Sequence, residues 1–84
     1  MYEERTADFF LDITGQVCPL TFVKTKLMVE RMAAGQILEV RLRAGEPLEN
    51  VPRSLAELGH AVLAVEAEDA GDPGGIHRLW VRKA

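Results

Sequence analysis

Residues 37–43 place the strongest constraint on what this chain can fold into. Apolar and charged side chains alternate strictly along the segment, with Leu38, Val40 and Leu42 on one side and Glu39, Arg41 and Arg43 on the other. A period of two is typical of a β-strand that has one buried face and one face in water. The sequence therefore predicts a sheet that is covered on one side only.

The remaining apolar segments give a β-α-β-α-β-β order. Alternation predicts further strands at residues 9–13, 60–66 (through Ala61, Leu63 and Val65) and 76–82. Helices are predicted at residues 19–34 and 49–58, with Pro19 and Pro52 in their first turns and Gly35 and Gly59 after their ends. Residues 44–47 are expected to form a turn. The simplest architecture is an α/β (α+β) two-layer sandwich, with two helices on one face of a four-stranded mixed sheet.

The first predicted helix carries two apolar stripes, although a helix lying on one sheet needs only one. The first stripe holds Phe22, Val29, Met32 and Ala33, and the second holds Leu20, Val23, Leu27 and Ala34. Periodicity does not say which stripe is buried. The other stripe is expected to be an exposed apolar surface beside Cys18.

Size and composition bound the class of protein. The chain has 84 residues, which fits one domain at residues 9–84 after a disordered segment at residues 1–8. Its net charge of -3 gives no sign of direct nucleic-acid binding. One cysteine permits no intramolecular disulfide. The start of the chain does not resemble a signal peptide, and no apolar stretch approaches a membrane span. We expect a cytoplasmic protein with no membrane association.

The single cysteine is the candidate catalytic residue. Cys18 directly precedes Pro19, where the first helix is predicted to begin. The amide groups of Leu20 and Thr21 are expected to point toward its sulfur and, with the helix dipole, to favour a nucleophilic thiolate. Gly15 is expected to let the preceding loop bend.

Two lysines could support this site. Lys24 and Lys26 lie one to two helical turns after the cysteine and would add positive potential near the sulfur. Leu20, Val23 and Leu27 are expected to form the surface on which a partner docks.

Other functions for the cysteine remain open from position alone. Cys18 could be a small buried apolar residue. A structural zinc site needs four ligands, and the chain has one cysteine and two histidines, so we expect no metal and no cofactor. His60 and His77 are expected to be ordinary surface or strand-end residues, not the base of a cysteine nucleophile.

At this point the chain resembles the TusA/SirA-like sulfur carriers over residues 11–83. The specific part is the spacing Leu11-Asp12, Gly15, Cys18-Pro19; weaker matches are Lys24, Gly35, Leu38-Glu39-Val40, Gly59-His60 and Arg82-Lys83. The resemblance implies a two-layer β-α-β-α-β-β sandwich. It also implies that Phe22, Val29 and Met32 form the buried stripe.

The resemblance further implies a sulfurtransferase that relays sulfur as a persulfide on Cys18. A cysteine desulfurase or a rhodanese-type donor would load it, and a downstream acceptor protein would receive the sulfur for tRNA thiolation, molybdenum-cofactor chemistry or sulfur oxidation. Thr21 departs from the family, which usually has a second proline there. The alternatives are a non-catalytic interaction or regulatory domain of the same fold and, with less support since no resolving cysteine is present, a redox sensor.

Overall fold

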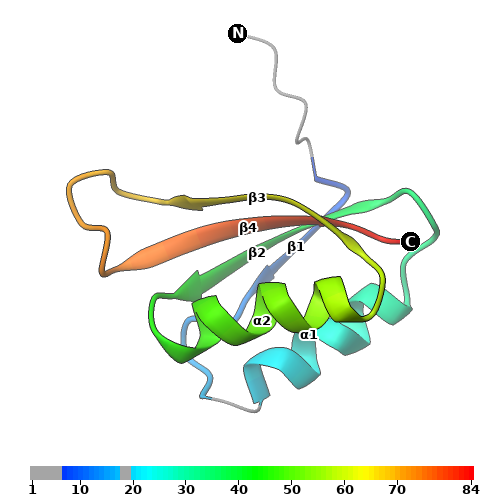
Figure 1. Ribbon diagram of the computed structural model, residues 1–84, viewed down its shortest axis with the longest axis horizontal. Coiled ribbons are helices and arrows are strands. Elements are labelled where there is room, and N and C mark those ends of the chain that lie inside the picture. Colours follow the sequence, from blue (N-terminus) through cyan, green and yellow to red (C-terminus); the bar gives the residue numbers. More distant parts are fainter. Residues whose placement is uncertain (1–6, 18–19) are drawn as a thin grey trace, which may run out of the picture.

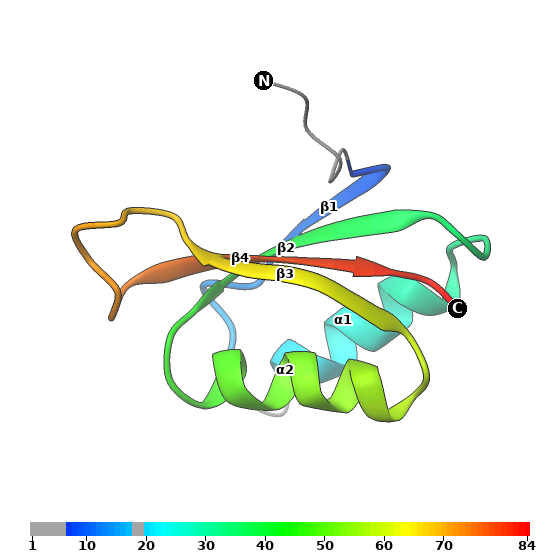
Figure 2. The same cartoon turned by 45° about the horizontal axis from the view of Figure 1, so that its top comes forward.

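The computed structural model describes residues 7–17 and 20–84, and it confirms the predicted two-layer fold. The elements in chain order are β1 (Phe9–Asp12), α1 (Leu20–Glu30), β2 (Ile37–Arg43), α2 (Glu46–Glu57), β3 (Ala61–Ala67) and β4 (Ile76–Arg82). The sheet order is β1-β2-β4-β3, with β1 parallel to β2 and the other pairs antiparallel. Both helices lie side by side on one face of the sheet, and no described helix covers the other face, which we call the open face (Figures 1 and 2).

The core lies between the sheet and the two helices. Its centre comes from the two middle strands, as the alternation in β2 predicted. The buried side chains are Leu38, Val40 and Leu42 of β2, Leu79 and Val81 of β4, Val51 and Leu55 of α2, Val29 of α1, and Ile13 and Met32. The one-sided burial follows from the register, because Leu38 and Val40 lie directly opposite Val81 and Leu79.

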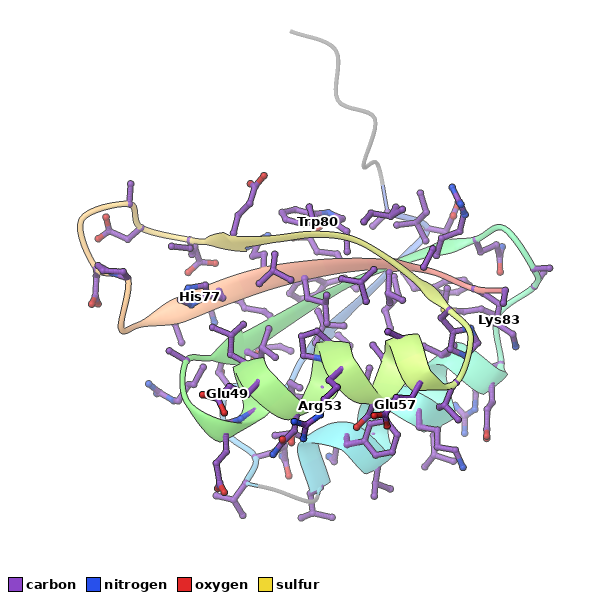
Figure 3. The ribbon with its side chains drawn as sticks, in the orientation of Figure 1. Glu49, Arg53, Glu57, His77, Trp80 and Lys83 are labelled. Carbon is purple, nitrogen blue, oxygen red and sulfur yellow. The ribbon has the colours of Figure 1, made fainter. Side chains whose placement is uncertain are left out.

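Helix α1 is shorter than predicted, because it ends at Glu30 and not at Ala34. The Lys83 ammonium, just after β4, donates hydrogen bonds to the carbonyl oxygens of Val29 (2.9 Å) and Met32 (3.1 Å). Figure 3 shows Lys83 at this end of the molecule. A cation at a helix C-terminus satisfies carbonyl groups that have no partner within the helix. The apolar residues after Glu30 therefore belong to a capped turn.

Helix α2 starts earlier than predicted, at Glu46 and not at residue 49. Gly45 precedes it with φ at 100°, and Pro47 occupies the first turn, where no intrahelical donor is needed. The expected turn at residues 44–47 is therefore confirmed for Ala44 and Gly45, whereas Glu46 and Pro47 already belong to the helix. Pro52 lies inside the helix instead of in its first turn.

Two edge strands also differ in detail from the sequence expectation. In β3, Val62 lies opposite the buried Val81 and packs against the core, and the pairing with β4 then shifts between Val62 and Ala64, which breaks the simple alternation expected there. Before β1, the Asp8 amide donates to the Ile37 carbonyl (2.8 Å), and the Asp8 carboxylate accepts from the Ile37 amide (2.8 Å). Asp8 is thus part of the folded domain.

Candidate functional site

The described chain approaches the expected site from both sides. Cys18 and Pro19 themselves lie outside the described residues, so their roles stay predictions. Val17, on one side, is exposed, and Leu20, on the other, is the first residue of α1. The chain on both sides of the cysteine therefore runs along the surface of the protein.

The start of α1 differs from the expected anion site in one respect. The Leu20 amide donates a hydrogen bond to the Val17 carbonyl (2.8 Å). It is already used within the chain, and the expectation that it points toward the cysteine sulfur concerns Cys18, which lies outside the described residues. The positive end of the helix dipole remains at this position.

The buried face of α1 includes two polar residues that the sequence analysis did not assign to the core. Thr21 and Thr25 are fully buried, in line with Val29 and Met32. The Thr25 hydroxyl donates to the Thr21 carbonyl (2.8 Å), which satisfies it inside the helix. A search for apolar residues alone misses this stripe, because its first half consists of threonines. The i, i+4 spacing with Val29 is the signal that could have found it.

The buried face also includes Thr21, the position at which the sequence departs from the pattern that it resembles. Its side chain is fully buried, so this departure lies on the core side of α1.

The opposite face of α1 is apolar and exposed, as expected. Leu20, Val23 and Leu27 expose 47%, 42% and 52% of their surface. Of the other stripe, Val29 and Met32 are buried, and Phe22 is half-buried against the core. We call Leu20, Val23 and Leu27 the outer stripe of α1.

The two lysines differ in whether a carboxylate of the described chain pairs with them. Lys26 pairs with Glu30 at 3.4 Å, four residues along the same helix. Lys24 is exposed, and among residues 7–17 and 20–84 no carboxylate forms an ion pair with it. Lys24 is therefore the cation beside the outer stripe whose charge is not compensated within the described chain.

Gly15 does not have the conformational role expected of it. The glycines with positive φ are Gly35, Gly45 and Gly59, and Gly15 is not among them. A Cβ atom added at Gly15 would meet no other atom within 4 Å. The turn itself is closed by a bond from the Gln16 amide to the Ile13 carbonyl (3.1 Å), with no positive φ at position 15.

Charged side chains hold the turn after β1 to the open face of the sheet. One Asp12 carboxylate oxygen accepts from the Thr14 amide (2.9 Å) and hydroxyl (2.7 Å), and the other accepts from Arg41 (3.1 Å). Arg43 donates to the Thr14 carbonyl (3.0 Å). Arg41 also makes a two-pronged contact with Glu68, at 2.9 Å for each bond. We call Asp12, Thr14, Arg41, Arg43 and Glu68 the turn network.

The turn network shifts the protonation equilibria of its carboxylates. Hydrogen bonds from the Thr14 amide and hydroxyl, and then Arg41, lower the pKa of Asp12. Hydrogen bonds from Arg41 and Arg78 lower the pKa of Glu68 to about 2. Both carboxylates are therefore ionised at neutral pH.

The remaining candidates for chemistry have structural partners. His77 is buried, not a surface residue, and its Nδ1 lies 3.2 Å from the Gly75 carbonyl. His60 Nδ1 accepts a hydrogen bond from the Ala84 amide (3.1 Å). Within the described part of the chain, no three histidine, cysteine or carboxylate side chains form a group that could hold a metal. Neither described helix is long and apolar enough to cross a membrane.

Comparison with known proteins defines the class of this domain. A family model described as "Sulfurtransferase TusA" matches residues 9–83. A putative sulfur carrier protein of Archaeoglobus fulgidus is 48% identical over 60 residues, which cover 71% of this chain and 68% of that protein. The sulfur carrier protein TusA of Pseudomonas syringae is 30% identical over 81 residues, covering 96% of this chain and 90% of that protein.

A solved structure supports the fold independently. The crystal structure of a SirA-like protein from Desulfitobacterium hafniense superposes with a TM-score of 0.70 at 20% identity, covering 88% of this chain and 95% of that one. The chain belongs to the TusA family of sulfur carriers. Sulfur transfer is the activity that defines this family.

The conformation of Gly15 leads to a first prediction. Gly15→Ala should leave the free energy of unfolding unchanged or raise it by up to about 1 kcal/mol, because alanine restricts only the unfolded chain. Gly35→Ala is the matched variant. Gly35 has φ at 90°, so it should lose about 1 kcal/mol. Urea unfolding measures both, and a large loss in Gly15→Ala would contradict the account of this turn.

The lowered carboxylate pKa values lead to a second prediction. The pKa of Glu68 is about 2 in the folded state and 4.5 when unperturbed. Its contribution to stability is complete above pH 4.5 and is lost as the pH falls toward 2. The thermal unfolding midpoint should therefore decrease as the pH is lowered from 4.5 toward 2. The decrease should be smaller in Glu68→Gln, which lacks the titrating group. If the unfolding midpoint changes equally with pH in the wild type and in Glu68→Gln, the prediction is contradicted.

Proposed function

We propose that Cys18 carries a transferable sulfur as a persulfide, and that the chain relays this sulfur from a donor protein to an acceptor protein. The observation that carries the proposal is the outer stripe of α1, an exposed apolar surface on the helix that follows the cysteine in a sequence of the TusA family. Scattered exposed apolar residues are common on proteins. Here they lie on one helix face, directly after the one cysteine of the chain.

The proposed chemistry needs no external oxidant or reductant. The Cys18 thiolate attacks the outer sulfur of a persulfide on the donor protein. A sulfur–sulfur bond forms on Cys18, the donor's sulfur–sulfur bond breaks, and the donor thiolate leaves. In the second half, a nucleophile on the acceptor attacks the outer sulfur, and the Cys18 thiolate leaves.

The start of α1 supports the anionic form of the sulfur. The dipole of a helix stabilises a negative charge at its N-terminus by about 0.3–1 kcal/mol. Lys24 adds positive charge one turn along the helix. Since the Leu20 amide is bound to the Val17 carbonyl, it contributes little to this effect. The stabilisation within the chain is therefore modest, and we infer that a charged group of the partner contributes during transfer.

Partner proteins would dock on the outer stripe of α1, beside Lys24. We propose a cysteine desulfurase or a rhodanese-type protein as donor and a second protein as acceptor, all in the cytoplasm. The acceptor would serve tRNA thiolation, molybdenum-cofactor chemistry or sulfur oxidation. An apolar stripe with a cation beside it suits a partner surface that is apolar and has an acidic edge. Thr21, buried beneath the stripe, does not obstruct this contact.

Sulfur loading leads to a third prediction. After incubation with a cysteine desulfurase and cysteine, the wild-type chain should gain the mass of one sulfur atom and lose it on reduction, as measured by intact-mass spectrometry. Cys18→Ser should gain nothing, since it lacks the only thiol.

A folded wild-type chain that accepts no sulfur from several desulfurases, rhodanese-type donors or small persulfides would exclude the carrier function. The chain would then be an interaction or regulatory domain that has kept the fold. Circular dichroism on the same samples shows whether the fold is intact.

A further inference from the structure

The outer edge of β3 is a border of the sheet that has no partner strand within the described chain. β3 is the last strand in the order β1-β2-β4-β3, so only its side toward β4 is paired (Figure 1). We propose that this edge pairs with the same edge of a second copy of the chain, antiparallel and about a two-fold axis, so that the two sheets become one. This pairing does not depend on the proposed sulfur transfer.

The backbone of β3 directs part of its hydrogen-bonding groups away from the sheet. Directly after β3, the Glu68 amide donates to the Ile76 carbonyl (2.9 Å), so these two residues face each other as a bonded pair. Bonded and non-bonded pairs alternate along antiparallel strands. Counting back from Glu68 through the regular register with β4, the N–H and C=O groups of Val65 and Ala67 therefore point outward.

The side chains of β3 do little to prevent a second strand from pairing there. Edge strands are usually protected by charged residues, prolines or bulges. From Ala61 to Val65 the strand has no charged residue and no proline, and Val65 exposes 40% of its surface. The register shift between Val62 and Ala64 lies toward the start of the strand. Residues 64–67 therefore remain a regular and accessible edge.

The opposite edge of the sheet is less suited to pairing with its own copy. β1 has 4 residues, whereas β3 has 7. An antiparallel pairing of β1 centred on Phe10 would place Asp12 opposite Asp8 of the second copy. Like charges directly opposite each other destabilise a strand pair. Of the two edges, β3 is therefore the one that fits a copy of itself.

Charge selects the register of the proposed pairing. Residues with outward backbone groups must lie opposite one another, so the two-fold axis can pair Val65 with Val65, Val65 with Ala67, or Ala67 with Ala67. The second arrangement places Glu66 directly opposite its own copy, and the third places Glu66 opposite Glu68. The first places Glu66 opposite Ala64, where no like charge meets it. We therefore expect the register centred on Val65.

This register also covers the exposed apolar side chain of the edge. Val65 lies opposite Leu79 in the sheet, and Leu79 is buried in the core, so Val65 is on the side of the sheet that carries the helices. Its copy would lie directly opposite it, and the two side chains would remove each other's exposed surface from water. A closed two-fold interface uses the same surface on both chains, as this edge does.

The size of the contact predicts a weak and reversible dimer. One pair of short strands lies at the small end of protein interfaces, where association is transient. The edge of β3 shares no residue with the outer stripe of α1. The two outer stripes of a dimer would therefore not be used in holding its chains together.

Sedimentation equilibrium of the full chain tests the association itself. A reductant is included so that a disulfide through the single cysteine does not contribute. The average mass should rise from that of the 9.3 kDa chain toward twice that value between about 10 µM and about 1 mM, the range of a weak dimer. A wild-type chain that is still monomeric at about 1 mM would overturn the proposal.

Two variants at Val65 test whether this edge is the interface. Val65→Lys keeps the backbone and places two ammonium groups opposite each other, and Val65→Pro removes the outward amide without removing a bond to β4. Each should weaken dimerisation about tenfold or more. Val17→Lys is the matched control, because Val17 is 71% exposed and lies outside the edge, and it should associate like the wild type.

Circular dichroism shows whether the variants are folded, and Val65→Lys decides the matter if Val65→Pro does not fold. Wild-type association in Val65→Lys, or an equal loss in Val17→Lys, would contradict the proposed edge.

Amide hydrogen exchange of the wild type tests the backbone pairing directly. The amides of Val65 and Ala67 should exchange more slowly as the chain concentration rises, in proportion to the fraction of dimer, because they become bonded to the second copy. The amides of β1 should not change. A dimer by mass whose Val65 and Ala67 amides gain no protection would assign the contact to another surface and overturn the proposal.

Discussion

The packing of α1 on the sheet through its threonine-containing face is the constraint on which the rest of the site depends. Thr21, Thr25, Val29 and Met32 all face the core, and the hydroxyl of Thr25 is satisfied within the helix. Because the side chains of this face are buried in the core, the rotation of the helix about its axis is fixed. The outer stripe is then exposed as a consequence of how the other face packs.

The length of α1 is set from a distant part of the chain. Lys83, after the last strand, binds carbonyl oxygens at the end of the helix, so β4 determines where α1 stops. The same strand lies in the middle of the sheet, between β2 and β3. The position of the helix that follows the cysteine is therefore tied to the strand that the chain adds last, and the site requires the whole domain to be folded.

The sequence predicted the elements whose signal is local. The alternation at residues 37–43 and 76–82 gave both central strands with their observed bounds. The errors occurred where a distant or polar group decides the outcome. The end of α1 depends on Lys83, more than fifty residues away. The buried face of α1 contains threonines, and hydrophobic periodicity does not detect them.

The candidate site was predicted less completely than the fold, for the same physical reason. The exposure of the outer stripe could be expected, whereas the bond from the Leu20 amide to the Val17 carbonyl could not. The turn network joins Asp12 to Arg41 and Arg41 to Glu68, across 29 and 27 residues of sequence. Only the register of the strands brings these charges together, so no local pattern reveals them.

The central claim is that the outer stripe of α1 is the surface on which sulfur donors dock. The most direct test replaces Leu27, the most exposed residue of the stripe, with glutamate and measures loading of Cys18 by a cysteine desulfurase and by a small-molecule persulfide. The account predicts an unchanged unfolding midpoint, unchanged loading by the small molecule, and a KM for the desulfurase reaction raised about tenfold, as expected when a central apolar contact becomes charged. Desulfurase loading at the wild-type KM would contradict it.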